Sequence, residues 1–275
     1  MIGIIGAICG DVIGSKHEIS KRTESIPYDF RLIRPDSIIT DDSIHTIAVA
    51  DWLINSDRSS KELVDRLIKW SNKFFFAGYG SMFRKWLISK DHLPYNSFGN
   101  GSAMRVSPVA WIAKSEEECI DLAKRSAEVT HNHPEGIKGA IAVAVAIFHN
   151  KNGKDKEFIK NRIIELTDYN LNRKYGDIHY DKFDATCQGT VPESIICWLD
   201  SENYEDCVRK AVCLGCDTDT QAAIAGSICA ANPETQVPNN IIMDVIKYGC
   251  LRDNEFIHVL NKFNNEVNCV WQTTK

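Results

Sequence analysis

Apolar residues recur at helical spacing along most of the chain. Three such runs cover residues 43–54, 59–70 and 115–129, and two more cover 134–148 and 217–231. Alternation at the two-residue period of a strand is scarce. The pattern predicts an all-α protein in which many short helices pack around one core.

Several helix starts carry recognisable capping residues. Ser59 with Glu62, and Ser115 with Glu118, have the spacing of a capping box. Pro134 suits a first helical turn. These signals place the predicted helix starts close to the beginnings of the apolar runs.

The first fifteen residues, "MIGIIGAICGDVIGS", predict a buried helix that is interrupted by Asp11. Gly6, Gly10 and Gly14 recur at every fourth position and form a bare stripe if the segment is helical. Each glycine costs a helix about 1 kcal/mol relative to alanine. Close packing against another backbone is the interpretation that explains this cost.

Two long stretches lack a helical pattern, residues 16–37 and 168–182. Loops of this length in a compact domain are commonly lids, binding loops or disordered segments. No stretch rich in Pro, Gly and Ser and no block of charge marks a domain boundary, so we expect one domain over residues 1–275.

Composition narrows the class of protein. The 275 residues are 44% hydrophobic and 25% charged, as in a globular protein, and the net charge of −5 offers no basic face for nucleic-acid phosphates. The apolar start is too short for a membrane span. Ten cysteines without a signal peptide are expected to be reduced thiols, which indicates the cytoplasm.

Two clusters of threonine and aspartate stand at predicted helix starts far apart in sequence. The first is "TDDS", with Thr40, Asp41 and Asp42. The second is "DTDT", whose members of interest are Asp217, Asp219 and Thr220. One cluster alone is more typical of a helix cap. Two clusters of oxygen ligands favour Mg²⁺, Mn²⁺ or Ca²⁺, because four aspartates brought together without cations would repel one another.

Glycine-rich turns and two histidines are candidates for ligand contact. "GYGS" at residues 78–81 and "SFGNGSAMR" at residues 97–105 permit close approach to a ligand, although a plain turn explains either alone. His131 and His133 precede a helix start and are expected to bond to a ligand or to the backbone. Cys213 and Cys216 are expected to be packing thiols, not a redox or zinc pair.

Taken in order, "GDVIGSKHE", "TDDS", "GYGS", "SFGNGSAMRVSP", "THNHPEGIKGA" and "GCDTDTQAAIAGS" resemble the ADP-ribosylglycohydrolase family. The motifs run from residue 10 to residue 227. The resemblance implies an all-α single domain that binds two Mg²⁺ or Mn²⁺ ions. It also implies hydrolysis of the bond between ADP-ribose and an acceptor.

The resemblance assigns roles to particular residues. The implied metal ligands are Thr40, Asp41, Asp42, Asp217, Asp219 and Thr220. The implied substrate-binding residues are Gly78, Tyr79, Gly80, Ser81, Ser97, Phe98, Gly99, Asn100 and His131, with Phe98 placed to stack on adenine. Catalytic roles fall to Glu18, Asp41 and Asp42, and Glu18 matches the glutamate of a mobile loop. One carboxylate must handle a proton, and the choice between Glu18 and a metal-bound aspartate such as Asp42 stays open.

Two positions depart from the family pattern. Ser43 replaces a threonine and lies outside the matched ligands. Cys216 stands where a second glycine is common, so its side chain is expected to affect the turn before Asp217.

The expected partner is an ADP-ribosylated protein or small molecule, with ADP-ribose as product, and the expected state is a monomer. Nucleic acid enters only as a possible ADP-ribosylated acceptor, and no membrane contact is expected. A Mg²⁺-dependent phosphate-ester hydrolase and a catalytically silent ADP-ribose-binding relative are the alternatives.

Overall fold

The computed structural model describes residues 3–18, 25–248 and 253–273, with side chains to residue 268. Within these ranges the chain is helical and contains no strand, which confirms the predicted all-α class. The helices are α1 (Ile5–Gly14), α2 (Asp41–Asn55), α3 (Ser60–Lys73), α4 (Ser81–Leu87), α5 (Gly101–Met104), α6 (Ser107–Ile112), α7 (Glu116–Glu128), α8 (Pro134–Lys151), α9 (Lys156–Thr167), α10 (Cys187–Leu199), α11 (Tyr204–Cys213), α12 (Thr218–Cys229), α13 (Asn239–Tyr248) and α14 (Asn254–Thr273).

The five helical runs expected from apolar spacing correspond to α2, α3, α7, α8 and α12. Ser59 and Ser115 cap α3 and α7, with their side chains accepting hydrogen bonds from the N–H groups of Glu62 and Glu118. Pro134 occupies the first turn of α8, as predicted. Local sequence therefore determines where these helices begin.

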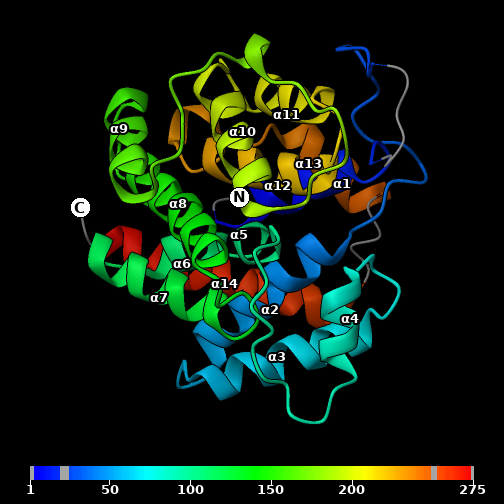
Figure 1. Cartoon of the computed structure of the whole chain (residues 1–275), viewed down its shortest axis with the longest axis vertical. Coiled ribbons are helices and arrows are strands. Elements are labelled where there is room, and N and C mark those ends of the chain that lie inside the picture. Colours follow the sequence, from blue (N-terminus) through cyan, green and yellow to red (C-terminus); the bar gives the residue numbers. More distant parts are fainter. Residues whose placement is uncertain (1–2, 19–24, 249–252, 274–275) are drawn as a thin grey trace.

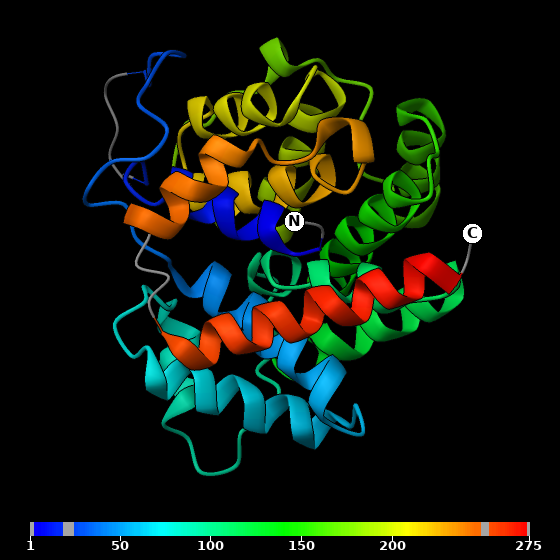
Figure 2. The same ribbon diagram turned by 180° about the vertical axis from the view of Figure 1, so that it is seen from behind.

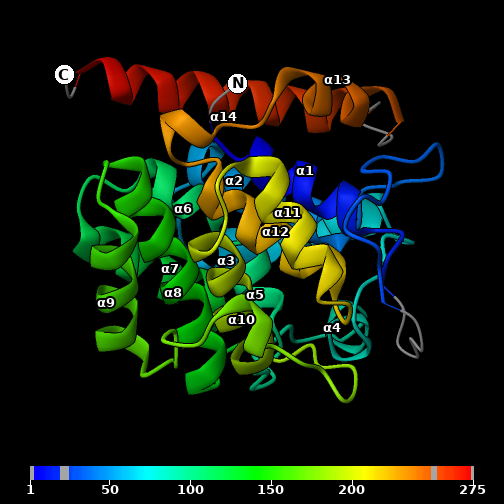
Figure 3. The ribbon, with the colours of Figure 1, turned by 90° about the horizontal axis from the view of Figure 1, so that it is seen from above.

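Helix α12 lies in the interior, and every one of its residues is buried. Helices α1, α8, α10 and α11 pack around it, as Figures 1 and 3 show. On the other side of the molecule, α14 crosses the back and contacts α2 and α6 (Figure 2). Buried apolar side chains from all these helices join in one core cluster.

The glycine stripe of α1 faces α12 directly. A Cβ added at Gly10 would lie 2.1 Å from the carbonyl oxygen of Ala222, and one added at Gly14 would lie 2.4 Å from that of Thr218. Real Cβ atoms do not approach a backbone so closely, so the predicted close packing is confirmed. The contact also places the residue after Gly10 beside the N-terminus of α12.

The two stretches without helical pattern are loops where the structure describes them, apart from a 3₁₀ turn at Tyr175–Asp177. Residues 19–24 of the first stretch, within the expected mobile loop, lie outside the described residues. None of the described helices combines the length and the apolar character that crossing a membrane requires.

Candidate metal and ligand site

A cavity of about 440 Å³ opens where the C-terminal end of α1 meets the N-terminal ends of α2 and α12. The turn before α4 and the segments before α5, α8 and α10 also line it. All six residues predicted as metal ligands line it: Thr40, Asp41, Asp42, Asp217, Asp219 and Thr220. The fold therefore brings the two sequence clusters to one place.

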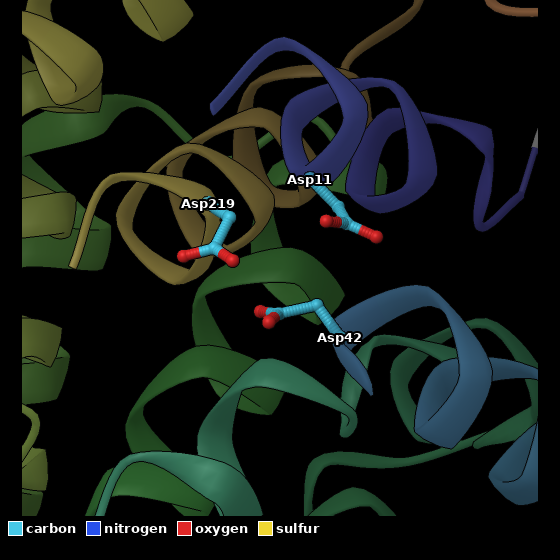
Figure 4. Close-up of side chains that lie close together, drawn as sticks. All are labelled: Asp11, Asp42 and Asp219. Carbon is cyan, nitrogen blue, oxygen red and sulfur yellow. The ribbon is translucent and has the colours of Figure 1, made fainter. Parts of the chain in front are cut away.

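The carboxylates in the cavity form two overlapping groups. Oxygens of Asp11, Asp42 and Asp219 all lie within 4.8 Å of one another, and so do oxygens of Glu18, Asp217 and Asp219. Figure 4 shows the first group, with side chains from α1, α2 and α12 pointing into a common space. Asp219 belongs to both groups.

Asp11 connects α1 to the start of α2. Its Oδ2 accepts hydrogen bonds from the backbone N–H of Thr40 at 3.0 Å and of Ser43 at 3.1 Å. Its two oxygens also accept from the hydroxyls of these residues, with Thr40 Oγ1 2.7 Å from Oδ1. Asp11 thus fixes the helix start that carries Asp41 and Asp42.

Asp11 was missed as a member of this site in the sequence, where it only interrupted an apolar run. A charged residue that is fully buried needs partners, so its position among apolar neighbours was the available signal. Ser43, which the resemblance left outside the ligand set, contributes by bonding to Asp11.

Hydroxyl and amide groups hold the remaining carboxylates. Thr40 Oγ1 and Thr220 Oγ1 each lie 3.2 Å from Asp42 Oδ2, which joins the two clusters directly. Asn100 Nδ2 donates to Asp217 Oδ2 at 2.7 Å. The other oxygen of Asp42, Oδ1, is buried and has no hydrogen-bond partner among the described residues.

The crowded carboxylates resist ionisation. Burial, and then the charge of Asp219, raises the pKa of Asp11 to about 7. Burial and the same neighbouring charge also hold the pKa values of Asp41, Asp42 and Asp217 well above their ordinary range. Glu18, at the accessible rim, has a pKa raised to about 7 by desolvation and by Asp219. Divalent cations would reverse these shifts by favouring the ionised carboxylates.

The donor set fits a hard divalent cation. The converging groups are carboxylates and threonine hydroxyls, which suit Mg²⁺ or Mn²⁺, and Asp42 Oδ1 offers a buried oxygen with no protein partner. Asp42, Asp217 and Asp219 of the predicted clusters, with Asp11 and Glu18, could therefore hold such ions, whereas the carboxylate of Asp41 belongs to neither converging group. Helix α12 also directs its N-terminus toward the same space.

The turn before Asp217 has a left-handed backbone. Gly215 and Cys216 adopt φ angles of +71° and +81°. The Cys216 thiol accepts a hydrogen bond from the backbone N–H of Asp184 at 3.0 Å, so its side chain is anchored to a neighbouring loop. The expected effect of Cys216 on this turn stays a prediction, and no second cysteine is joined to it among the described thiols.

Most of the predicted ligand-binding residues line the cavity, and they come from three segments of the chain. Those that line it are Gly78, Gly80, Ser81, Ser97, Gly99, Asn100 and His131. Gly78 has a φ of +99°, which suits a glycine turn, and the backbone N–H of Asp41 is tied to this turn through the carbonyl of Ala77 at 2.7 Å. The glycine turn and the first acidic cluster are thus neighbours.

Two aromatic residues of the predicted set lie outside the lining. Tyr79 is buried, and its ring packs 5.2 Å from that of His45 and 5.4 Å from that of Phe83. Phe98 is 46% exposed, and its ring centroid lies 5.3 Å from that of His133. Stacking of Phe98 on adenine stays a prediction, and its exposure leaves the ring available.

The two histidines play different parts. His133 Nδ1 accepts a hydrogen bond from the backbone N–H of Glu135 at 3.1 Å and caps α8. His131 Nδ1 lies 2.7 Å from the hydroxyl of Thr130, and the ring lines the cavity. Both histidines were expected to bond to a ligand or to the backbone, and His133 bonds to the backbone.

The model of the ADP-ribosylglycohydrolase family matches residues 2–257. An uncharacterized protein of Archaeoglobus fulgidus is 32% identical over 147 residues, covering 48% of each chain. ADP-ribosylhydrolase ARH3 of Homo sapiens is 23% identical over 303 residues, covering 83% of each.

A solved structure of an ADP-ribosylglycohydrolase-related protein complex has a TM-score of 0.75, with 96% of each chain covered at 20% identity. At this identity the likeness concerns the fold. The aligned region spans about half the length of the archaeal relative.

Proposed function

The chain belongs to the ADP-ribosylglycohydrolase family, and we propose from this premise that it is a metal-dependent hydrolase of the bond between ADP-ribose and an acceptor. The observation that carries the proposal is the position of Asp219, which lies in both carboxylate groups of the cavity. A cavity of about 440 Å³ lies within the usual range for small-molecule sites. The name of the human relative, ADP-ribosylhydrolase ARH3, agrees with this activity.

Two Mg²⁺ or Mn²⁺ ions would be held by the residues of the two sequence clusters. Asp11 supports the first cluster through its hydrogen bonds to Thr40 and Ser43. When bound, such ions supply positive charge that orients sugar hydroxyls and activates water. Asp11 acts on the ligand set by fixing the start of α2. Asn100 orients Asp217 in the same way.

The chemistry of the bond suits a cavity rich in carboxylates. Departure of the acceptor develops positive charge on the ribose, which nearby ionised carboxylates stabilise. One carboxylate must also transfer a proton between water and the leaving group. Glu18 at the rim and Asp42 at the base are the candidates, and Glu18 is the more accessible of the two.

The other walls fit the rest of the substrate. The left-handed turn at Gly78, which lines the cavity, offers backbone N–H groups to phosphates. Phe76 and Met82 line the cavity and are exposed, so we expect the acceptor to approach beside them. The substrate class comprises ADP-ribosylated proteins and ADP-ribosylated small molecules.

The test is an assay of purified protein against ADP-ribosylated arginine, ADP-ribosylated serine, ADP-ribosylated nucleic-acid ends and acetylated ADP-ribose. Chromatography would measure ADP-ribose release with Mg²⁺, with a chelator, and with Mg²⁺ restored. We expect metal-dependent release from at least one substrate. Release of phosphate instead would indicate a phosphate-ester hydrolase, and binding of ADP-ribose without turnover would indicate a silent relative.

A further inference from the structure

A fully buried arginine stands behind His131 without a carboxylate partner. Arg105 Nη2 donates to the carbonyl oxygen of Ser126 at 2.7 Å and to Thr130 Oγ1 at 2.8 Å. Its Nε and Nη1 atoms have no partner among the described residues, and no described acid pairs with it. The guanidinium charge is therefore not neutralised next to the cavity wall.

The hydroxyl of Thr130 links this arginine to His131. Thr130 is fully buried, and its Oγ1 lies 2.7 Å from His131 Nδ1. Arginine can only donate, so Oγ1 uses a lone pair for Arg105 and retains one proton to give. Within the described part of the chain, His131 Nδ1 is the atom positioned to accept that proton in a hydrogen bond.

The alternative direction of this bond leaves a group unsatisfied. If Nδ1 carried a proton and donated it, Oγ1 would accept two bonds and its own buried O–H would have no acceptor. An unsatisfied buried donor is costly. Nδ1 is therefore the acceptor, and a neutral ring then carries its proton on Nε2.

The ring is also held neutral. Burial, and then the charge of Arg105, keeps the pKa of His131 well below its ordinary range. Its Nε2 faces Gly101, where an added Cβ would lie 2.9 Å away, and both residues line the cavity. None of the described residues accepts a hydrogen bond from Nε2.

We propose that Arg105, acting through Thr130, fixes His131 in the Nε2–H tautomer so that this nitrogen donates a hydrogen bond to an oxygen of the ligand in the cavity. Arg105 and Thr130 are positioning residues, and His131 contacts the ligand. The relay is a property of the free protein. Only the identity of the ligand, ADP-ribose, rests on the proposed function.

The first test reads the tautomer directly. Protein labelled with ¹⁵N in its histidine rings is examined by long-range ¹H–¹⁵N correlation, and His131→Gln identifies the signals of this ring among the eight histidines. The wild type should show an unprotonated Nδ1 and a protonated Nε2. A proton on Nδ1 in the wild-type protein would overturn the proposal without any variant.

The second test uses substitutions at Thr130. Thr130→Val keeps the side-chain shape but removes the hydroxyl, so the fixed tautomer should be lost and the Kd for ADP-ribose, measured by calorimetry with Mg²⁺, should rise about tenfold. Thr130→Ser restores the hydroxyl and should rescue both. Thr167→Val, which removes a buried hydroxyl bonded to Ile163 in α9, is the matched control and should change neither.

Unchanged ring signals and affinity in Thr130→Val would refute the relay. A wild-type chain that binds no ADP-ribose would refute the proposed function and ADP-ribose as the ligand, while the nitrogen signals would still decide the tautomer. The two failures are thus distinguishable.

Discussion

Replacement of Asp219 by Asn should stabilise the metal-free protein at pH 8 and remove its response to metal. Asp219 lies within 4.8 Å of carboxylate oxygens in both groups of the cavity. Two unit charges at this separation repel by about 3 kcal/mol at an effective dielectric constant of about 20. The amide of Asn removes this repulsion, and its oxygen can still accept from the Thr220 N–H as Asp219 does at 2.9 Å.

The sign of the pH dependence follows from the raised pKa values. Between the unfolded carboxyl pKa and the raised folded value, the folded protein binds more protons than the unfolded chain, so wild-type stability falls as pH rises. Asp219→Asn should therefore raise the free energy of unfolding of the metal-free protein by up to about 3 kcal/mol at pH 8 and leave it unchanged near pH 4.

Urea unfolding followed by circular dichroism, with chelator and with Mg²⁺, measures both effects. Asp51→Asn is the matched control, because Asp51 is also buried but lies near Lys69 and Trp70, away from the cavity. This control should lose stability in both conditions and keep the gain from Mg²⁺. The reasoning is refuted if Asp219→Asn destabilises the metal-free protein at pH 8 or gains as much from Mg²⁺ as the wild type.

Three further predictions concern other parts of the structure. The metal-free wild type should lose stability as pH rises from about 4 through the raised Asp11 pKa of about 7, and Asp11 alone should account for a loss on the order of 4 kcal/mol. Urea titrations with Mg²⁺ should show no such loss. Gly10→Ala should lower the free energy of unfolding by about 2 kcal/mol and weaken Mn²⁺ binding, because the added Cβ would force α1 away from α12. Gly176→Ala, where nothing lies within 4 Å of the added atom, should change neither. Phe98→Ala should weaken ADP-ribose binding by about 1 to 3 kcal/mol in calorimetry with little change in Tm; unchanged affinity would remove Phe98 from the site.

Helices with strong local signals were the predictable part of the fold. In α3 and α7 the apolar spacing begins directly after an N-cap serine, Ser59 or Ser115. The apolar pattern and the capping residue therefore predict the same helix start. Helix α10 lacks this agreement, because Pro192 lies inside it and removes a backbone donor. Its position depends on packing against α12, which no local pattern reveals.

The candidate site was predictable where chemistry is concentrated in short motifs. Both acidic clusters and most of the glycine turns line the cavity as expected. Asp11 was missed because its partners, Thr40 and Ser43, follow it only after a long loop. The roles of Arg105 and Thr130 were missed because they depend on hydrogen bonds between turns that are distant in sequence.

The central claim is that the two acidic clusters form one metal site. Crystals grown with Mn²⁺ and measured for anomalous scattering above and below the manganese edge test it most directly. The account predicts two anomalous peaks in the cavity between α1, α2 and α12, and their loss in Asp219→Asn crystals. Absence of manganese from the wild-type cavity at saturating Mn²⁺, or peaks only elsewhere on the protein, would contradict it.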